Sequence, residues 1–289
     1  MSDAAAKTGI GPMFMIAVEQ TFPPAQRVVE DPLAYRILPP SLRAFAWLLK
    51  PAWARDWMVR ATDDSLPGMW GWMMCRKRYI DDRLAEDAPA MGAVLNLGAG
   101  FDTRALRLPA LAGVPVWEVD QEQNIRQKEA RLRAAGLTPP PGLTLLAVDF
   151  DRERLDEALA KAGLDLGRPQ FCIWEGVTQY LTEAAVHQTL QLLSGAASGS
   201  RLAFTYVLKD FLEGTALYGQ EALREKYVVK ERAWLYGIAP DDVAGLLDGY
   251  GWDVLEHVGA EELSQRYVAP TGRPLATTPI ERMVYAGKR

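Results

Sequence analysis

Val94-Leu95-Asn96-Leu97-Gly98-Ala99-Gly100 is the stretch of this chain that predicts its fold. The apolar run is a candidate strand, and it ends at two glycines that permit a tight turn because neither carries a Cβ atom. A second apolar run, 115–119, ends at Asp120. The charged stretch 121–135 separates it from the next strand-like run, 144–148, and indicates a crossover helix. Strand, turn and helix in this order predict a parallel βαβ unit.

The same alternation continues to the end of the chain. Thr182 is a good N-cap residue, and it precedes apolar residues at helical spacing, as does the stripe 243–250. Further strand-like runs lie at 170–174, 201–208, 252–258 and 283–286. We therefore predict an α/β, Rossmann-like sheet of seven strands, with the last strands antiparallel.

Two regions do not follow this alternation. Residues 1–90 are rich in Trp, Met, Pro and Arg, with helical fragments at 42–49 and 70–84, and are predicted to form an N-terminal helical cap. Residues 209–239 follow the fifth strand and are too long for a plain connection in a compact domain. We expect this insertion to be a lid within a main domain that spans 91–289.

Composition and charge exclude several classes of function. The 37 acidic and 32 basic side chains leave a net charge of −5, the wrong sign for a protein that binds nucleic acid. Two cysteines and two histidines are too few for a disulfide framework or a typical zinc site, so no metal is expected. No secretory signal and no membrane-spanning run is recognised, which favours a cytoplasmic protein without a membrane partner.

The glycine turn and Asp120 together point to a nucleoside cofactor. Gly98-Ala99-Gly100 resembles the start of a dinucleotide-binding fingerprint, although Thr103 stands where the third glycine belongs. Asp120 ends the next strand twenty residues beyond Gly100, where a carboxylate can accept hydrogen bonds from ribose hydroxyls. The alternative is an ordinary strand-to-helix turn beside a solvated aspartate.

Four motifs in chain order resemble those of one family. The string 96–104 with Arg107-Leu108 is similar to the first motif of the leucine carboxyl methyltransferase family and its bacterial polyketide O-methyltransferase branch. The later matches are Trp117-Glu118-Val119-Asp120, Val148-Asp149-Phe150 and the "EGV…YL" segment 174–181. The resemblance implies a class I methyltransferase that uses S-adenosyl-L-methionine (SAM), with S-adenosyl-L-homocysteine (SAH) as its product.

The resemblance also implies where SAM binds. Arg76, which opens an "R-x-x-x-I-D" segment, would hold the methionine carboxylate, because a guanidinium can bond both carboxylate oxygens. Asp120 would bind the ribose, and Glu175 would lie near the amino group. Asp149 and Phe150 would meet the adenine. The full set of expected cofactor contacts is Arg76, Gly98, Ala99, Gly100, Asp102, Arg104, Asp120, Asp149, Phe150 and Glu175.

The N-terminal region matches the family less completely. Asp31-Pro32-Leu33-Ala34 fits its "DP-x-A" landmark, but 15–19 offers no basic residue where relatives carry one. Five tryptophans precede the sheet region, and we interpret them as core residues and a wall of the acceptor pocket. They are Trp47, Trp53, Trp57, Trp70 and Trp72.

A small-molecule carboxylate is the expected methyl acceptor. A carboxylate with a pKa near 4 needs no base, whereas a phenol with a pKa near 10 usually does, and the sequence offers little base near the strand ends. Tyr180 and Tyr206 are the candidate catalytic residues, with Arg201 or Arg224 to orient the acceptor. The alternatives are phenol or hydroxyl methylation, a nicotinamide-dependent dehydrogenase, and a SAM-binding protein without catalysis.

Overall fold

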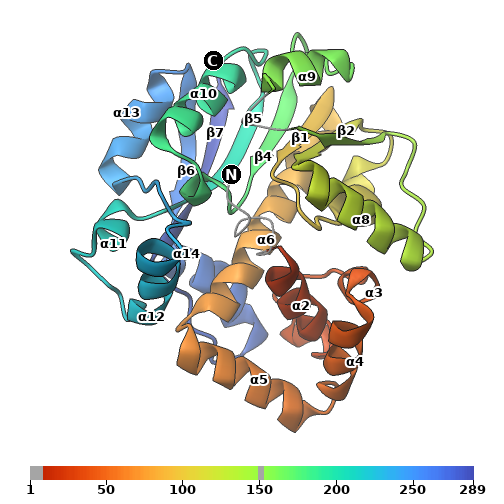
Figure 1. The fold of residues 1–289 in the computed structure, drawn as a ribbon, viewed down its shortest axis with the longest axis vertical. Coiled ribbons are helices and arrows are strands. Elements are labelled where there is room, and N and C mark those ends of the chain that lie inside the picture. The colour runs from red at the N-terminus through yellow and green to blue at the C-terminus, as the bar shows by residue number, and fades with distance from the viewer. Residues whose placement is uncertain (1–8, 149–152) are drawn as a thin grey trace.

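A seven-stranded sheet lies at the centre of the computed structural model, which describes residues 9–148 and 153–289 (Figure 1). The strand order is β3-β2-β1-β4-β5-β7-β6. Strands β1 to β5 pair in parallel, and β7 is antiparallel to both β5 and β6. The predicted seven-stranded sheet is confirmed, with β7 alone reversed, since β6 runs in the direction of β5. The strands are β1 (Ala93–Leu97), β2 (Val116–Asp120), β3 (Leu143–Ala147), β4 (Gln170–Trp174), β5 (Arg201–Val207), β6 (Trp252–Val258) and β7 (Glu281–Lys288).

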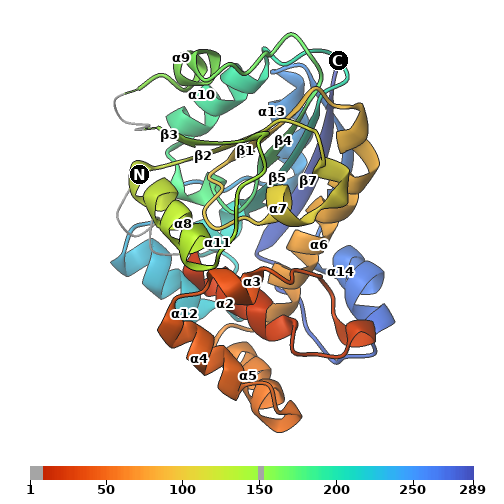
Figure 2. The same ribbon diagram turned by 90° about the vertical axis from the view of Figure 1, so that its right-hand side faces the viewer.

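Helices cover both faces of the sheet, so its central strands are apolar on each side. In β4 all residues are buried: Phe171 contributes to the core on one face and Cys172 to the core on the other. Burial raises the pKa of the Cys172 thiol to about 12, in keeping with an inert core residue. One face packs against α9 (Leu155–Lys161), α10 (Glu183–Leu193) and α13 (Val243–Asp248). The other packs against α6 (Met69–Asp87), α7 (Arg104–Arg107) and α8 (Glu122–Ala134) (Figure 2).

The N-terminal region is helical, as predicted, and it shares a core with the sheet. Met74 of α6 belongs to the same apolar cluster as Phe171 and Tyr285 of the sheet. The short C-terminal helix α14 (Ala260–Leu263) packs on α6 from the opposite end of the chain. The division of the chain at residue 90 therefore stays a prediction. The remaining N-terminal helices are α2 (Ile10–Glu19), α3 (Ala34–Ile37), α4 (Pro40–Leu48) and α5 (Ala52–Ser65).

The five N-terminal tryptophans divide into two groups. Trp70 and Trp72 on α6 are fully buried, as expected for core residues. Trp47, Trp53 and Trp57 are 57%, 75% and 55% exposed on α4 and α5, at the outer end of the molecule (Figure 1). For these three the core prediction is wrong, because α4 and α5 bury mainly small side chains against the body and turn their tryptophans outward.

The predicted lid insertion forms a compact layer between β5 and α13. It contains α11 (Lys209–Glu213), α12 (Glu221–Arg224) and a π-helical turn at Glu225–Lys230. Phe211 and Leu223 join the apolar core that also holds α10 and α13. The insertion is therefore packed onto the sheet's carboxyl edge by buried side chains.

Trp70→Ala should destabilise the protein by about 3–5 kcal/mol, because it empties a buried site and removes the indole donor from one oxygen of the Glu19 carboxylate. The Trp70 Nε1 atom donates to Glu19 Oε2 at 3.0 Å. Trp53→Ala is the matched control and should change the free energy of unfolding by less than about 0.5 kcal/mol. Urea unfolding measures both, and equal losses would contradict the assignment of buried and exposed tryptophans.

Candidate active site

The glycine turn lies beside the carboxyl end of β2. Leu97 pairs with Val119, so the turn begins next to Asp120. Gly98 and Gly100 have φ of +71° and +51°, which favour glycine. A Cβ atom on Gly98 would also collide with the side chain of Val177. The local sequence thus produces a tight turn with backbone exposed toward the space above the sheet.

Asp120 fixes this turn through its carboxylate. Its Oδ2 atom accepts from the Gly100 amide at 2.7 Å, and its Oδ1 atom accepts from the Asn124 side chain at 2.7 Å. Asp120 is 3% exposed and still lines the cleft above the sheet. One edge of its carboxylate therefore organises the turn while the group remains within reach of a ligand.

A cleft of about 330 Å³ lies at the carboxyl ends of β1, β2 and β4. The ends of parallel strands are where α/β sheets bind their ligands. The walls of the cleft come from the glycine turn, the end of β2, the segment after β4, the start of β7, helices α2 and α6, and the lid. Its lining includes Met13, Met15, Met69, Met73, Arg76, Lys77, Gly98, Ala99, Gly100, Asp102, Asp120, Glu175, Gln179, Tyr180, Leu223, Tyr227, Trp234 and Glu281.

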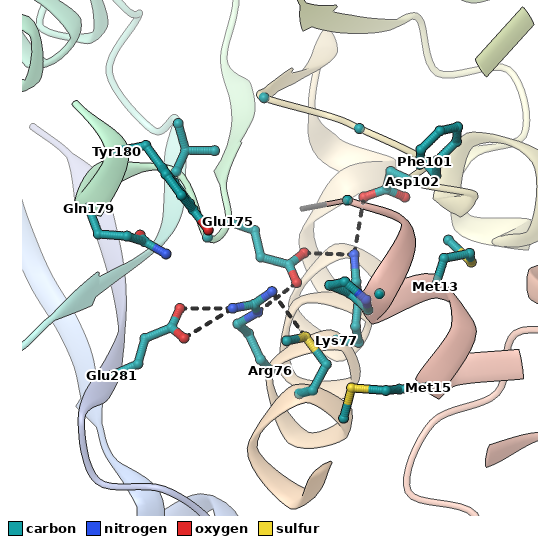
Figure 3. A pocket seen from close by; sticks show the side chains of 18 of the residues that line it. Met13, Met15, Arg76, Lys77, Phe101, Asp102, Glu175, Gln179, Tyr180 and Glu281 are labelled. Atoms are coloured by element: carbon teal, nitrogen blue, oxygen red, sulfur yellow. Dashed lines mark hydrogen bonds and ion pairs between the residues drawn. The ribbon is translucent and has the colours of Figure 1, made fainter. Parts of the chain in front are cut away.

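Ion pairs around Glu175 form the charged half of the cleft (Figure 3). Arg76 Nε lies 2.9 Å from Glu175 Oε1, and Lys77 Nζ lies 3.1 Å from Glu175 Oε2. Arg104 Nη1 lies 2.9 Å from the same Oε2 atom. Glu175 therefore joins α6, the glycine turn and the end of β4.

The cations hold the neighbouring acids in their ionised form. Burial alone would raise the pKa of Glu175, but Lys77, Arg104 and Arg76 hold that pKa well below its usual range. Asp102 behaves in the same way: burial opposes its charge, and Arg104 with Lys77 holds the pKa of its carboxyl far below normal. Both acids remain negatively charged throughout the physiological range.

Glu281 was not anticipated from the sequence. It comes from β7 and accepts from Arg76 Nη1 at 2.9 and 3.1 Å, while Trp72 Nε1 donates to it at 2.7 Å. No local pattern connects Glu281 with Arg76, since 205 residues separate them. Lys77, also missed, directly follows Arg76 in sequence. It lines the cleft together with Met15, which belongs to the stretch 15–19 where the family's basic residue is missing.

Arg104 lies behind the cleft rather than in its lining. Its guanidinium is fully buried and pairs with Asp81 at 2.7 Å and Asp102 at 2.5 Å, besides Glu175. Arg107 extends the network to Asp81 from the other side. The geometry gives Arg104 the role of holding three carboxylates, so its predicted direct contact with the cofactor has no support from its position.

The two candidate tyrosines have different environments. Tyr180 lines the cleft, with its ring 6.3 Å from that of Trp234 in the lid. Tyr206 is fully buried within β5, and its hydroxyl lies 2.8 Å from His257 Nε2, outside the lining of the cleft. Burial raises the pKa of Tyr206 above its usual range. A catalytic role for Tyr206 stays a prediction without a place in the cleft.

The remaining predicted residues are placed as follows. Arg201 donates to backbone carbonyls at the start of β5, and Arg224 donates to those of Phe211 and Leu212 within the lid, so neither reaches the cleft. Asp149 and Phe150 lie outside the described residues. Within 9–148 and 153–289, no cluster of acidic, histidine or cysteine side chains is arranged to hold a metal ion. In the same ranges no helix has the length and hydrophobicity to cross a membrane.

The strand order and the cleft at the glycine turn define the fold of class I methyltransferases. Two solved structures share it: a predicted methyltransferase from Thermobifida fusca YX and a DUF574 family protein from Streptomyces avermitilis MA-4680. The first has a TM-score of 0.56 over 82% of this chain and 88% of its own, at 14% identity. The second has a TM-score of 0.55 over 82% and 91%, at 16% identity.

Sequence comparison then gives the family. Residues 9–194 match the model of the leucine carboxyl methyltransferase family. A predicted SAM-dependent methyltransferase of Streptomyces coelicolor is 35% identical over 72% of this chain and 69% of its own length. Another, from Mycolicibacterium paratuberculosis, is 33% identical over 78% and 76%. The chain belongs to the leucine carboxyl methyltransferase family and is a SAM-dependent methyltransferase, which confirms the predicted family and cofactor.

Arg76→Ala and Asp120→Ala should each weaken SAM binding by about ten- to a hundredfold, the effect of losing one charge-assisted hydrogen bond. Arg78→Ala is the matched control, because Arg78 lies on the same helix and pairs with Asp82 at the surface. Calorimetric titration with SAM measures the affinities. An unchanged affinity in either test variant would remove that residue from the site.

Gly98→Val should abolish detectable SAM binding, since a side chain there strains a left-handed residue and collides with Val177. Gly199→Val is the control: Gly199 has a φ of +85° but open space around it, in a turn before β5. Both variants should lose stability, and only Gly98→Val should lose binding. A Gly98→Val protein that binds SAM normally would show that the cleft is misplaced.

Proposed function

We propose that this methyltransferase acts on a carboxylate oxygen of a small molecule and forms a methyl ester. The observation that carries the proposal is the distribution of charge in the cleft. Its ionised groups are gathered around Arg76 and Glu175 and are paired with one another, whereas the wall formed by the lid is uncharged. The charged part of the cleft suits the amino and carboxylate groups of the cofactor. The uncharged wall formed by the lid suits an acceptor that needs no proton transfer.

The residues of the charged half fit the parts of SAM. Arg76 and Lys77 offer donors for a carboxylate, Glu175 offers an acceptor for an amino group, and Asp120 offers an acceptor for ribose hydroxyls. When bound, SAM supplies a methyl group already activated on a positively charged sulfur. The protein's own contribution is then to hold both reactants in line and to exclude water.

Glu175, Glu281 and His257 are poorly placed to act as a general base that removes a proton from the acceptor. Glu175 is held ionised by three cations, and Glu281 is bound to Arg76 and Trp72. His257 contacts Tyr206 and Arg282, and it does not line the cleft. A carboxylic acid is already ionised at neutral pH, so its oxygen can form the new bond to carbon while sulfur retains the electron pair of the broken bond.

The resemblance to the polyketide branch supports a natural-product acid as the acceptor. The apolar lid side chains Leu223, Tyr227 and Trp234 would contact its body. Tyr227 and Trp234 are stacked with ring centroids 5.1 Å apart, which gives this wall a defined shape. We assign the lid to acceptor binding on these grounds.

Methyl transfer to acids should yield a product that mild alkali hydrolyses, and kcat/KM should stay flat from about pH 6 to pH 8. The reason is that both the acceptor acid and Glu175 are ionised across this range. Labelled SAM with a panel of acids, phenols and alcohols provides the measurement. An alkali-resistant product, with a rate that rises with pH, would instead assign a phenol or hydroxyl acceptor.

A further inference from the structure

We propose that helices α4 and α5 bind reversibly to the surface of an anionic lipid bilayer. The inference goes beyond the proposed function and does not depend on the identity of the methyl acceptor. The sequence favoured a protein without a membrane partner because it shows no signal or membrane-spanning run, and binding at a bilayer surface requires neither. The side chains concerned, here called the tryptophan surface, are Phe45, Trp47, Leu48, Trp53 and Trp57.

The first observation is that exposed apolar side chains are concentrated on these two helices. Nine large apolar side chains are exposed in the described part of the chain, and the tryptophan surface holds five of them. The other four are dispersed over the lid and β6. Single exposed apolar side chains are ordinary, whereas a cluster marks a surface for binding another molecule or a membrane. The clustering therefore identifies α4 and α5 as a contact surface.

The second observation is the position of these helices at one end of the molecule. Figure 1 and Figure 2 both show α4 and α5 at this end, and residues 49–51 join them. Trp53 and Trp57 are four residues apart and share one face of α5, while Ala54 and Val59 are buried against the body. An end formed by two short helices can place indole rings among lipid headgroups, where tryptophan is favoured.

The third observation is that unpaired cations surround the tryptophan surface. Arg43 lies one turn before Trp47 on α4, Lys50 lies in the connection, and Arg60 follows Trp57 by three residues on α5. No carboxylate among the described residues forms an ion pair with any of these three cations. The chain as a whole has a net charge of −5, so free cations here depart from its overall charge. Tryptophan with Lys and Arg is the composition that binds anionic lipid surfaces.

The acids of α5 do not cancel this positive charge beside the tryptophans. Asp56 lies 3.5 Å from Arg55 and offsets that cation. Asp63 and Asp64 both stand near the C-terminal end of α5, whereas Trp53 stands at its start. Contact between two copies of the chain through this surface would bring like charges together, which is unfavourable. An anionic bilayer therefore fits the tryptophan surface better than a second copy does.

The tryptophan surface is separated from the cleft by helix α2. The Phe45 ring stacks on the Phe14 ring of α2, with the ring centroids 5.5 Å apart. Met13 and Met15, on either side of Phe14 in sequence, line the cleft. A protein bound through α4 and α5 would hold one wall of its cleft close to the bilayer, where apolar molecules collect.

Sedimentation of the full chain with large unilamellar vesicles tests the proposal. The protein should bind vesicles of phosphatidylcholine and phosphatidylglycerol in equal parts more tightly than vesicles of phosphatidylcholine alone, and added NaCl should weaken binding by screening the charges. The double variant Trp53→Ala/Trp57→Ala should lose about ten- to a hundredfold in affinity for the anionic vesicles. Lys50→Glu, which reverses one charge, should lose about ten- to thirtyfold.

Leu255→Ala and Lys161→Glu are the matched controls. Leu255 is 55% exposed on β6, and Lys161 is an exposed cation on α9, at the opposite end of the molecule from α5 (Figure 1). Both controls should bind vesicles like the wild type, and all four variants should retain the wild-type affinity for SAM. No binding to the anionic vesicles, wild-type binding by the double variant, or equal losses in Lys50→Glu and Lys161→Glu would each overturn the proposal.

Two further measurements identify what covers the tryptophan surface. Vesicles that contain brominated phosphatidylcholine should quench the tryptophan fluorescence of the wild type more strongly than that of the double variant, and equal quenching would contradict insertion of these rings. In sedimentation velocity without lipid, the wild type and the double variant should have the same mass. A wild-type dimer that the double variant fails to form would assign the surface to a second copy and overturn the proposal.

Discussion

The buried ion pairs of Glu175 are the interaction on which the rest of the site depends. One carboxylate at the end of β4 is bound by Arg76 and Lys77 of α6 and by Arg104 after the glycine turn. Removing this acid would leave three cations close together with much of their compensation gone, which is strongly unfavourable in a buried site. The same contacts hold α6 against the strand ends, so that α6 and the end of β4 line the cleft together.

The network also explains how a protein with an excess of acids builds a site for a zwitterion. Cations and anions alternate from Asp81 through Arg104, Glu175 and Arg76 to Glu281. Each charge is paired with neighbours of opposite sign, so the groups are oriented before a ligand arrives. The lid completes the cleft with apolar side chains. The charged groups proposed to bind SAM are thus separate from the apolar side chains proposed to bind the acceptor.

Most of the fold followed from local pattern. Short apolar runs that end in Gly98 or Asp120 and alternate with amphipathic segments are sufficient for strands, turns and crossover helices, because each depends on residues near in sequence. The outward turn of Trp47, Trp53 and Trp57 was not predictable in this way. An aromatic residue on a helix is buried only if another element covers that face, and nothing among the described residues covers these three.

The sequence by itself determined the glycine turn, the acid at the end of β2, the arginine of α6 and the family to which they belong, because those motifs are contiguous and chemically specific. Only the tertiary structure decided which groups meet. It brought Glu281 to Arg76 across 205 residues, placed Arg104 behind the cleft, directed the Tyr206 hydroxyl toward His257 and left the Gln179 amide without a protein partner for its oxygen. Side-chain partners depend on how distant elements pack, and no local periodicity encodes that packing.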